Sequence, residues 1–200
     1  MQNTIITIAR AYGSGGRTIG KMLSKEMDFP YYDRNLIYMA SDKSGINVQR
    51  FFEQDEKIRK ESGFADFIPP ENRRYVSNND IFEYQSKIIH EISDHSDCII
   101  VGRCANFLLK NSGHKVLRVF IYAPDEVCID TIKKKFRVSE REAEKTFKQI
   151  NKHRREYYKY HTGIEWESAE NYDVCFDTSR MTYEQVVSAV VQYSKIFSSL

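Results

Sequence analysis

The sequence has little proline, cysteine or tryptophan and no long hydrophobic run. Its 200 residues include 4 Pro, 4 Cys and 1 Trp. Without about 18 consecutive apolar residues, no membrane span is expected. The first residues, Met1 to Ile8, lack the basic region and apolar core of a signal peptide. The cysteines show no CxxC spacing and no cysteine–histidine cluster, so they predict no metal site. A reducing cytoplasm is the simplest expected location.

Neither sign of charge is in large excess. The 30 Lys and Arg residues are met by 28 Asp and Glu residues, which gives a formal net charge of +2. This balance argues against a protein that coats a polyanion such as nucleic acid. The hydrophobic share of 41% and the charged share of 29% are typical of a globular protein. The chain is long enough for one domain with its own core.

Short apolar segments alternate with helical patterns along the chain. Strands are expected at residues 3–10, 29–32, 98–101, 116–122 and 174–176. Helices are expected from the glycine cluster to residue 27 and at 35–41, 48–60, 80–93, 125–136, 140–159 and 183–197, with a loop at 61–79. This alternation predicts one α/β domain whose parallel sheet is covered by helices on both faces. Ligands of such sheets bind at the carboxyl ends of the strands.

A glycine cluster between the first strand and the first helix has the form of a phosphate-binding loop. Residues 11–18 match the spacing G-x-x-x-x-G-K-[ST], with Ala11 for the first glycine and Arg17 for the lysine. Glycines let backbone N–H groups converge on phosphate oxygens, and the positive end of the helix adds to the attraction. The alternative is a plain tight turn. The residues expected to bind ATP are Gly13, Ser14, Gly15, Gly16, Arg17 and Thr18, and Thr18 would also ligate Mg²⁺.

The chain around this loop resembles the cytidylate kinase-like proteins, relatives of the nucleoside monophosphate kinases. The similar segments are residues 8–20, 30–37, 100–106, 154–158, 162–163, 166 and 171–173, so the resemblance covers nearly the whole chain. It implies a three-layer P-loop kinase-like fold with a five-stranded sheet. It also implies transfer of the γ-phosphoryl group of ATP to a nucleoside monophosphate such as CMP or dCMP. An acceptor-binding insertion would span about 34–79, and a helical lid about 137–165.

Four residues near the ends of the second and third strands are expected to bind the acceptor. The resemblance implies that Asp33, Arg34 and Tyr38 contact the nucleoside monophosphate. Arg103 follows Gly102 at the end of the third strand, where a guanidinium can grip a phosphate through two hydrogen bonds. Simpler roles remain open for three of them. Asp33 could cap a helix, Arg34 could be a solvated charge, and Arg103 could form an ion pair.

One arginine of a basic helix differs in phase from its neighbours. Residues 133–159 hold 11 Lys and Arg, and Ser139 begins a capping-box pattern. At 100° per residue, six basic residues share one face: Arg141, Lys145, Lys148, Lys152, Arg155 and Lys159. Arg154 falls among apolar residues, where a lone charge is costly to bury. We expect Arg154 to face inward and to act with Arg17 as a catalytic residue. The alternative is an ion pair with Asp33 or Asp173.

Three functions compete on the sequence alone. The leading one is an ATP- and Mg²⁺-dependent nucleoside monophosphate kinase with small-molecule nucleotides as partners. The second is a nucleotide-binding sensor that no longer transfers phosphate, because Met39, Asn106 and Asn151 replace charged residues of the family that the chain resembles. The third is a nucleic-acid module built on the basic face, which the net charge opposes. Neither nucleic acid nor a membrane is the expected partner.

Overall fold

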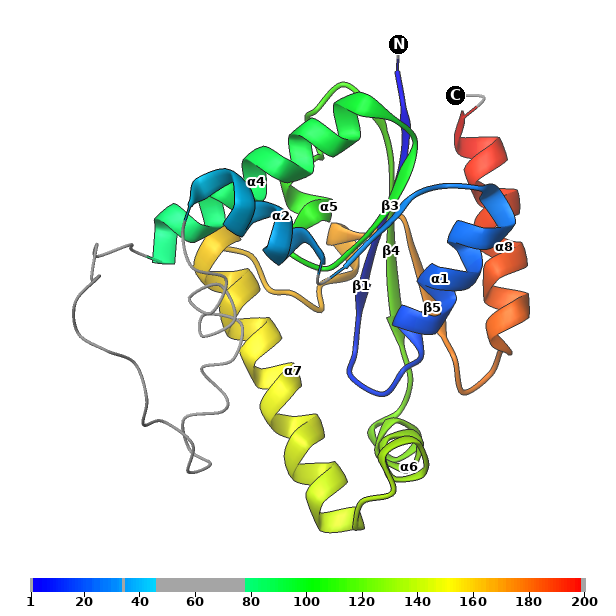
Figure 1. The fold of residues 1–200 in the computed structure, drawn as a ribbon. Helices are drawn as coiled ribbons and strands as arrows, with labels where there is room; N and C mark the ends of the chain where they lie inside the picture. The colour runs from blue at the N-terminus through cyan, green and yellow to red at the C-terminus, as the bar shows by residue number, and fades with distance from the viewer. Residues whose placement is uncertain (1, 34, 46–77, 199–200) are drawn as a thin grey trace, which may run out of the picture.

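A five-stranded parallel sheet forms the centre of the protein, whose computed structural model describes residues 2–33, 35–45 and 78–198. Along the sheet the order is β2-β3-β1-β4-β5 (Figure 1). The strands are β1 (Thr4–Arg10), β2 (Tyr31–Tyr32), β3 (Cys98–Val101), β4 (Lys115–Tyr122) and β5 (Val174–Asp177). The expected α/β fold with a parallel sheet is confirmed. Arg34 and the expected helix at 48–60 lie outside the described residues, as do residues 61–77 of the expected loop.

Helices cover both faces of this sheet, as the alternating pattern predicts. They are α1 (Gly16–Met27), α2 (Asn35–Ser44), α4 (Asn78–His95), α5 (Ala105–Leu108), α6 (Asp125–Phe136), α7 (Glu140–Thr162) and α8 (Tyr183–Ser198), with a short 3-10 helix, η2 (Ala169–Asn171). The capping box at Ser139 is formed, and Gly163 ends α7 in the left-handed conformation that favours glycine.

Several element bounds differ from the sequence-based expectation, and one short helix was not expected. β2 is shorter than 29–32, because the Phe29 N–H bonds back to the Ser24 carbonyl and Pro30 has no N–H to donate. α4 begins at Asn78, so the expected loop ends earlier than residue 79. α5 was not expected, because its four residues are too few to show a helical period.

Side chains that alternate along the strands divide the core into two layers. Ile6 and Ile8 pack with α1 and α8, whereas Ile5 packs with α2 and α4 on the other face. The chain leaving β1 enters α1 on one face, and the chain leaving the neighbouring β3 enters α5 on the other. Connections that diverge in this way open a crevice at the carboxyl ends of the two strands.

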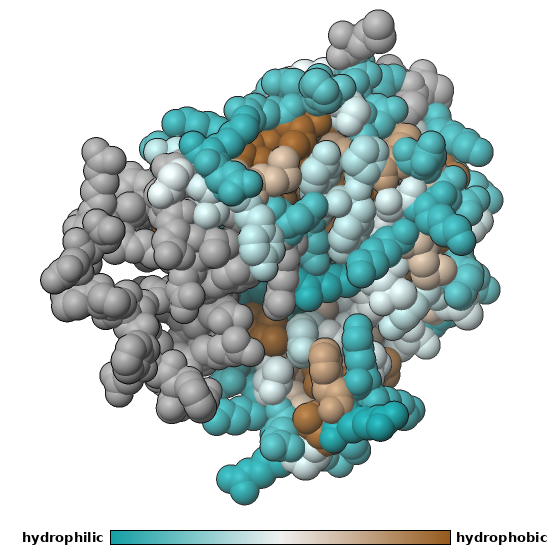
Figure 2. All heavy atoms as spheres, viewed as in Figure 1, coloured by the Kyte–Doolittle hydropathy of each residue, from teal (hydrophilic) through white to brown (hydrophobic). Residues whose placement is uncertain are grey.

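α6 and α7 extend beyond the carboxyl ends of β1 and β4, in the lower part of Figure 1. Their contact is apolar, because Cys128 and Ile132 of α6 pack with Ala143 and Phe147 of α7. Figure 2 shows hydrophobic residues over this part of the face, and a second hydrophobic group near the top of the view. The end of α6 exposes Phe136 to 52%.

All four cysteines have free thiols, and Cys98, Cys104 and Cys128 are buried. Burial raises the pKa of the Cys128 thiol to about 11 and that of Cys98 to about 12. Thiols with raised pKa values stay protonated at neutral pH and are poor nucleophiles. In the part of the chain that the structure describes, no helix has the length and hydropathy needed to cross a membrane.

His161 generates a prediction about acid stability. Its ring stacks on Phe82 with centroids 3.9 Å apart, and burial lowers its pKa from 6.5 to about 4. As pH falls through this window the unfolded chain takes up the proton first, so the free energy of unfolding decreases. We expect His161→Phe, which keeps the ring stack, to reduce the loss of thermal stability between pH 6.5 and about pH 4.

The control is His95→Gln, which changes an exposed histidine at the end of α4. Thermal denaturation followed by circular dichroism measures each variant across the same pH series. An equal acid-induced loss in the wild type and in His161→Phe would show that His161 does not drive it.

Candidate functional site

The glycine loop between β1 and α1 is shaped by residues that a side chain would disrupt. Gly13 has φ +90° and Gly15 has φ +83°, in the left-handed region that glycine adopts without strain. A Cβ at Gly13 would lie 2.5 Å from the Cys128 carbonyl oxygen. A Cβ at Gly15 would lie 2.2 Å from the Tyr183 ring. The turn therefore requires glycine at both positions.

Hydrogen bonds fix this loop to the ends of β1, β4 and β5. The buried Ser14 hydroxyl lies 2.9 Å from the Ala11 carbonyl and 3.0 Å from that of Ile121. The Thr178 hydroxyl, after β5, donates to the Ser14 carbonyl at 3.0 Å. α1 begins at Gly16, so the first N–H groups of the helix have no intrahelical acceptor and are oriented for an anion. Thr18 is exposed in the first turn.

The Asp33 carboxylate, at the end of β2, is shared by two guanidinium groups. Arg17 Nε lies 2.7 Å from Oδ2, and Arg10 Nη2 lies 3.5 Å from Oδ1. The Tyr31 hydroxyl lies 3.4 Å from Oδ2 and donates to it. Burial and the Asp33 charge raise the pKa of Tyr31 to about 12, so the hydroxyl keeps its proton. The structure thus brings together Arg17 and Asp33, two of the expected site residues.

Asp33, for which a capping role was the alternative, contacts the first turn of α2 through its main chain: its carbonyl accepts the Leu36 N–H at 3.2 Å. The helix begins two residues later at Asn35, and the Asn35 side chain accepts the Asp33 backbone N–H at 2.7 Å. Tyr38, another expected acceptor residue, lies on α2 and is 54% exposed.

Arg10 is a charged residue of this cluster that the sequence analysis did not single out. It is the last residue of β1, and its side chain is only 13% exposed. A Cβ at Gly16 would lie 2.5 Å from Arg10 Cβ, and one at Gly102 would lie 2.2 Å from Arg10 Nη1. Two glycines therefore make room for this side chain. The available signal was a cation directly after an apolar strand and before the loop.

Arg154 faces inward, as its helical phase predicts. Its Nη1 donates to the Arg10 carbonyl at 2.7 Å, and its guanidinium lies 5.7 Å from the centre of the Tyr12 ring. The two carboxylates considered as its partners are engaged elsewhere. Asp33 pairs with Arg10 and Arg17, and Asp173 accepts two hydrogen bonds from the Arg118 side chain.

Two buried asparagines tie α7 to the loop and to α5. Asn151 is 2% exposed, and its Oδ1 accepts the Tyr12 backbone N–H at 2.9 Å. The Asn106 side chain donates to the Tyr158 hydroxyl at 2.9 Å. These positions, where the resemblance leads one to expect carboxylates, make structural hydrogen bonds here. The sequence reasoning treated them only as missing charges.

Arg103 follows β3 with φ +58°, an uncommon conformation for a residue with a side chain. It is partly buried and follows β3, which pairs with β1 in the sheet. The neighbouring Cys104 is 4% exposed, and burial raises the pKa of its thiol. Cys104 is therefore a packing residue of the core.

The basic face of α7 is exposed and largely paired with acidic residues. The six residues expected on that face are all exposed. Lys148 pairs with Glu144, and Arg155 forms two hydrogen bonds of 2.8 Å with Glu167. Lys152 and Lys159 lie near Glu156 and Glu165. Neighbouring carboxylates therefore reduce the positive potential that a nucleic acid would need.

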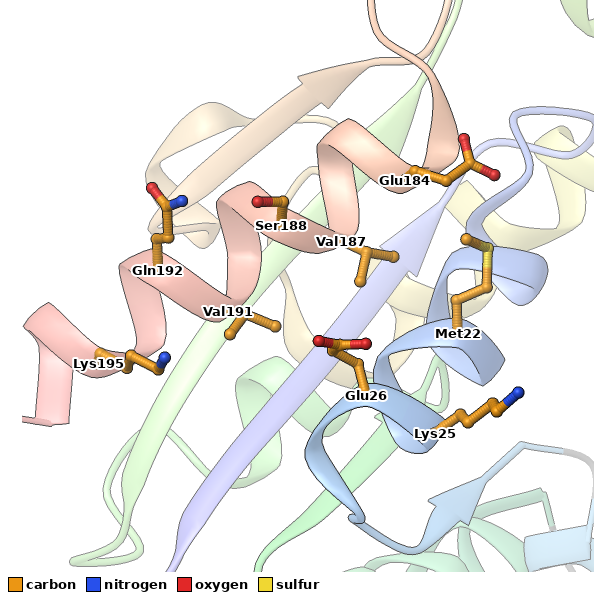
Figure 3. Close-up of a pocket in the computed structure, with 9 residues that line it drawn as sticks. All are labelled: Met22, Lys25, Glu26, Glu184, Val187, Ser188, Val191, Gln192 and Lys195. Atoms are coloured by element: carbon orange, nitrogen blue, oxygen red, sulfur yellow. The ribbon is translucent and has the colours of Figure 1, made fainter.

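A groove of about 660 Å³ lies between α1 and α8, away from the glycine loop (Figure 3). It is lined by Met22, Lys25, Glu26, Glu184, Val187, Ser188, Val191, Gln192 and Lys195. These come from the second half of α1 and from α8, and mix both signs of charge with valine side chains. The arginine cluster and the groove are therefore separate features.

The sequence pattern of the cytidylate kinase-like family matches residues 5–180. A cytidylate kinase from Pyrococcus abyssi is 25% identical over 188 residues, which are 93% of this chain and 91% of that protein. An S-adenosylmethionine-dependent nucleotide dehydratase from Lacinutrix mariniflava is 25% identical over 195 residues. That match covers 95% of this chain, which spans only 36% of the length of the dehydratase.

Solved structures share the fold at low sequence identity. A protein from Eubacterium ventriosum superposes with a TM-score of 0.72 at 20% identity, covering 96% of this chain and 99% of that one. Shikimate kinase from Acinetobacter baumannii gives 0.53 at 14% identity, covering 100% and 95%. The expected P-loop kinase-like fold is confirmed.

Asn151 generates a prediction about stability. Asn151→Leu keeps the approximate size of the side chain but leaves the Tyr12 N–H without its acceptor. The loss of a buried hydrogen bond costs about 1–3 kcal/mol. We expect that decrease in the free energy of unfolding, measured by chemical denaturation. Asn151→Asp keeps an acceptor oxygen and should lose less.

Lys152→Leu provides the matched control, because it places leucine at the next, exposed position of α7. It should change the free energy of unfolding by under about 0.5 kcal/mol. Equal destabilisation by the two leucine variants would contradict the role assigned to Asn151.

Proposed function

This chain belongs to the cytidylate kinase-like family, and from that premise we propose that it transfers the γ-phosphoryl group of ATP to a nucleoside monophosphate, with CMP or dCMP favoured. The observation that carries the proposal is the pairing of Arg17, in the glycine loop, with Asp33 at the end of β2. This pairing puts the expected donor-phosphate ligand beside an expected acceptor ligand, as a direct transfer requires.

The glycine loop is the proposed ATP site. Backbone N–H groups of residues 13–18 and the N-terminus of α1 would hold the phosphates. Thr18 fits a Mg²⁺ ion, because its exposed hydroxyl is a hard oxygen donor at the end of the loop. Nucleotide phosphates and waters would supply the other ligands, and the ion would neutralise charge on the phosphates.

Arg17 and Arg154 are the proposed catalytic residues. Phosphoryl transfer depends mostly on positioning and on stabilising negative charge, so no general base is strictly required. Arg17 lies at the start of α1, and the Arg154 guanidinium lies against Tyr12 of the same loop. In the lid proposed for residues 137–165, the part of α7 before Asn151 would close over the donor phosphates and exclude water, while Arg154 already lies at the loop.

The acceptor is proposed to lie in the crevice at the ends of β2 and β3. Asp33 would accept a hydrogen bond from the sugar or base, and Arg103 would grip its phosphate through two hydrogen bonds. Arg34 and Tyr38 are the remaining proposed acceptor residues. The names of the two similar proteins, a cytidylate kinase and a nucleotide dehydratase, support a nucleotide as acceptor.

The sensor alternative loses much of its basis. It rests on the absence of charge at Met39, Asn106 and Asn151. Met39 packs against the apolar core, and both asparagines make buried hydrogen bonds. The residues at these three positions therefore have structural roles, in packing and in attaching the loop. The cluster of Arg10, Arg17 and Arg154 is still present.

Arg154 and Arg155 give a matched test of the catalytic assignment. We expect Arg154→Gln to lower kcat by about 100-fold or more, the scale for removing one donor to a transition-state oxyanion. Arg155→Gln, on the exposed face, should change kcat by less than about twofold. Steady-state assays of ADP formation measure both. Equal effects would remove Arg154 from the catalytic role.

The acceptor is tested with a panel of CMP, dCMP, UMP, AMP and GMP, each with ATP and Mg²⁺. ADP formation that depends on CMP or dCMP and is lost in Arg17→Ala supports the proposal. ATP binding by calorimetry without product from any member would favour the sensor. Shikimate belongs in the panel, because a shikimate kinase shares the fold.

A further inference from the structure

Arg10 lies where phosphate chemistry is expected, yet it is not part of the loop motif. It ends β1, and Gly102 at the end of β3 leaves the space that its guanidinium occupies. A salt bridge at the surface would not need this close approach of two strand ends. The burial of Arg10 and the two glycines beside it indicate a position that accommodates a cation at the carboxyl ends of β1 and β3.

Arg17 forms an ion pair with the same carboxylate as Arg10, that of Asp33. Both contact the Asp33 carboxylate, whose side chain is 14% exposed. In these two ion pairs, two guanidinium groups share one carboxylate, and the low exposure of Arg10 and Asp33 strengthens the electrostatic interactions there. The cluster is therefore suited to a ligand that carries more than one negative charge.

The contact between Arg17 and Asp33 is close but poorly directed. Arg17 Nε lies 2.7 Å from Oδ2, yet its N–H makes no directed hydrogen bond to any described residue. The second contact, from Nη2 to Oδ1, is 3.4 Å long. A phosphoryl group has three oxygens in a tetrahedral arrangement. It could accept better-directed hydrogen bonds from both guanidinium groups than this carboxylate does.

We propose that Arg10 is a phosphate-binding residue, and that Asp33 is a tethered counter-anion which a phosphoryl group displaces from Arg10 and Arg17. This inference rests on the proposed function for the phosphate site but does not depend on which acceptor is used. The carboxylate keeps the two guanidinium groups together when no nucleotide is bound. A dianionic phosphoryl group competes with it better than a monoanion such as chloride does.

Inorganic pyrophosphate is the probe, and isothermal titration calorimetry measures its Kd in a chloride buffer. Arg10→Gln should raise the Kd by about tenfold or more, the effect of losing one charge-assisted hydrogen bond. Asp33→Asn removes the competing charge and should lower the Kd by about threefold. Arg141→Gln, on the exposed face of α7, is the charge-matched control and should leave the Kd unchanged.

Thermal denaturation without ligand establishes that each variant is folded. If Arg10→Gln does not fold, the Asp33→Asn arm still tests the displacement, because it leaves Arg10 intact. Asp33→Asn binding pyrophosphate no more tightly than the wild type overturns the proposal, as does folded Arg10→Gln binding as tightly as Arg141→Gln. Neither readout involves an acceptor, so failure of the proposed kinase activity would leave both results interpretable.

Discussion

Positive charge concentrated at the carboxyl end of β1 is the constraint on which the rest of the site depends. Arg10, Arg17 and Arg154 approach one another there, and each is held differently. Arg10 and Arg17 share the Asp33 carboxylate, whereas Arg154 donates to the Arg10 carbonyl. Without these partners, mutual repulsion and desolvation would oppose the arrangement. The parallel sheet brings the partners from separate strand ends to one edge.

The fold could be predicted largely from local pattern. Apolar β-branched runs and helical periodicity identified the five strands and most described helices, because each pattern spans several residues. The phase of α7 also separated Arg154 from Arg155, because one residue changes the direction on a helix by 100°. α5 was missed and the bounds of β2 were predicted too wide, since four and two residues carry too little periodic information.

The site was less predictable, because its key contacts join distant parts of the chain. The Arg10 guanidinium occupies the space beside residue 102, far along the sequence, that a Cβ would take if it were not glycine. The asparagines at 106 and 151 look like lost charges until their partners, the Tyr158 hydroxyl and the Tyr12 N–H, are known. The roles of Asp33 and Arg17 were expected separately, and their pairing required the three-dimensional register of β1, β2 and β3.

The attachment of α7 near its middle has a mechanical consequence. Asn151, Arg154 and Tyr158 hold the helix to the loop, to β1 and to α5, whereas Glu140 lies 11 residues before the first of these points. At a rise of about 1.5 Å per residue, the part of α7 before Asn151, which packs on α6, is an arm of about 16 Å. Pivoting the arm by about 10° would shift its tip by about 3 Å. Asn151 and Arg154 form hydrogen bonds with main-chain atoms of Tyr12 and Arg10. The same rotation would therefore displace the backbone that leads into the glycine loop.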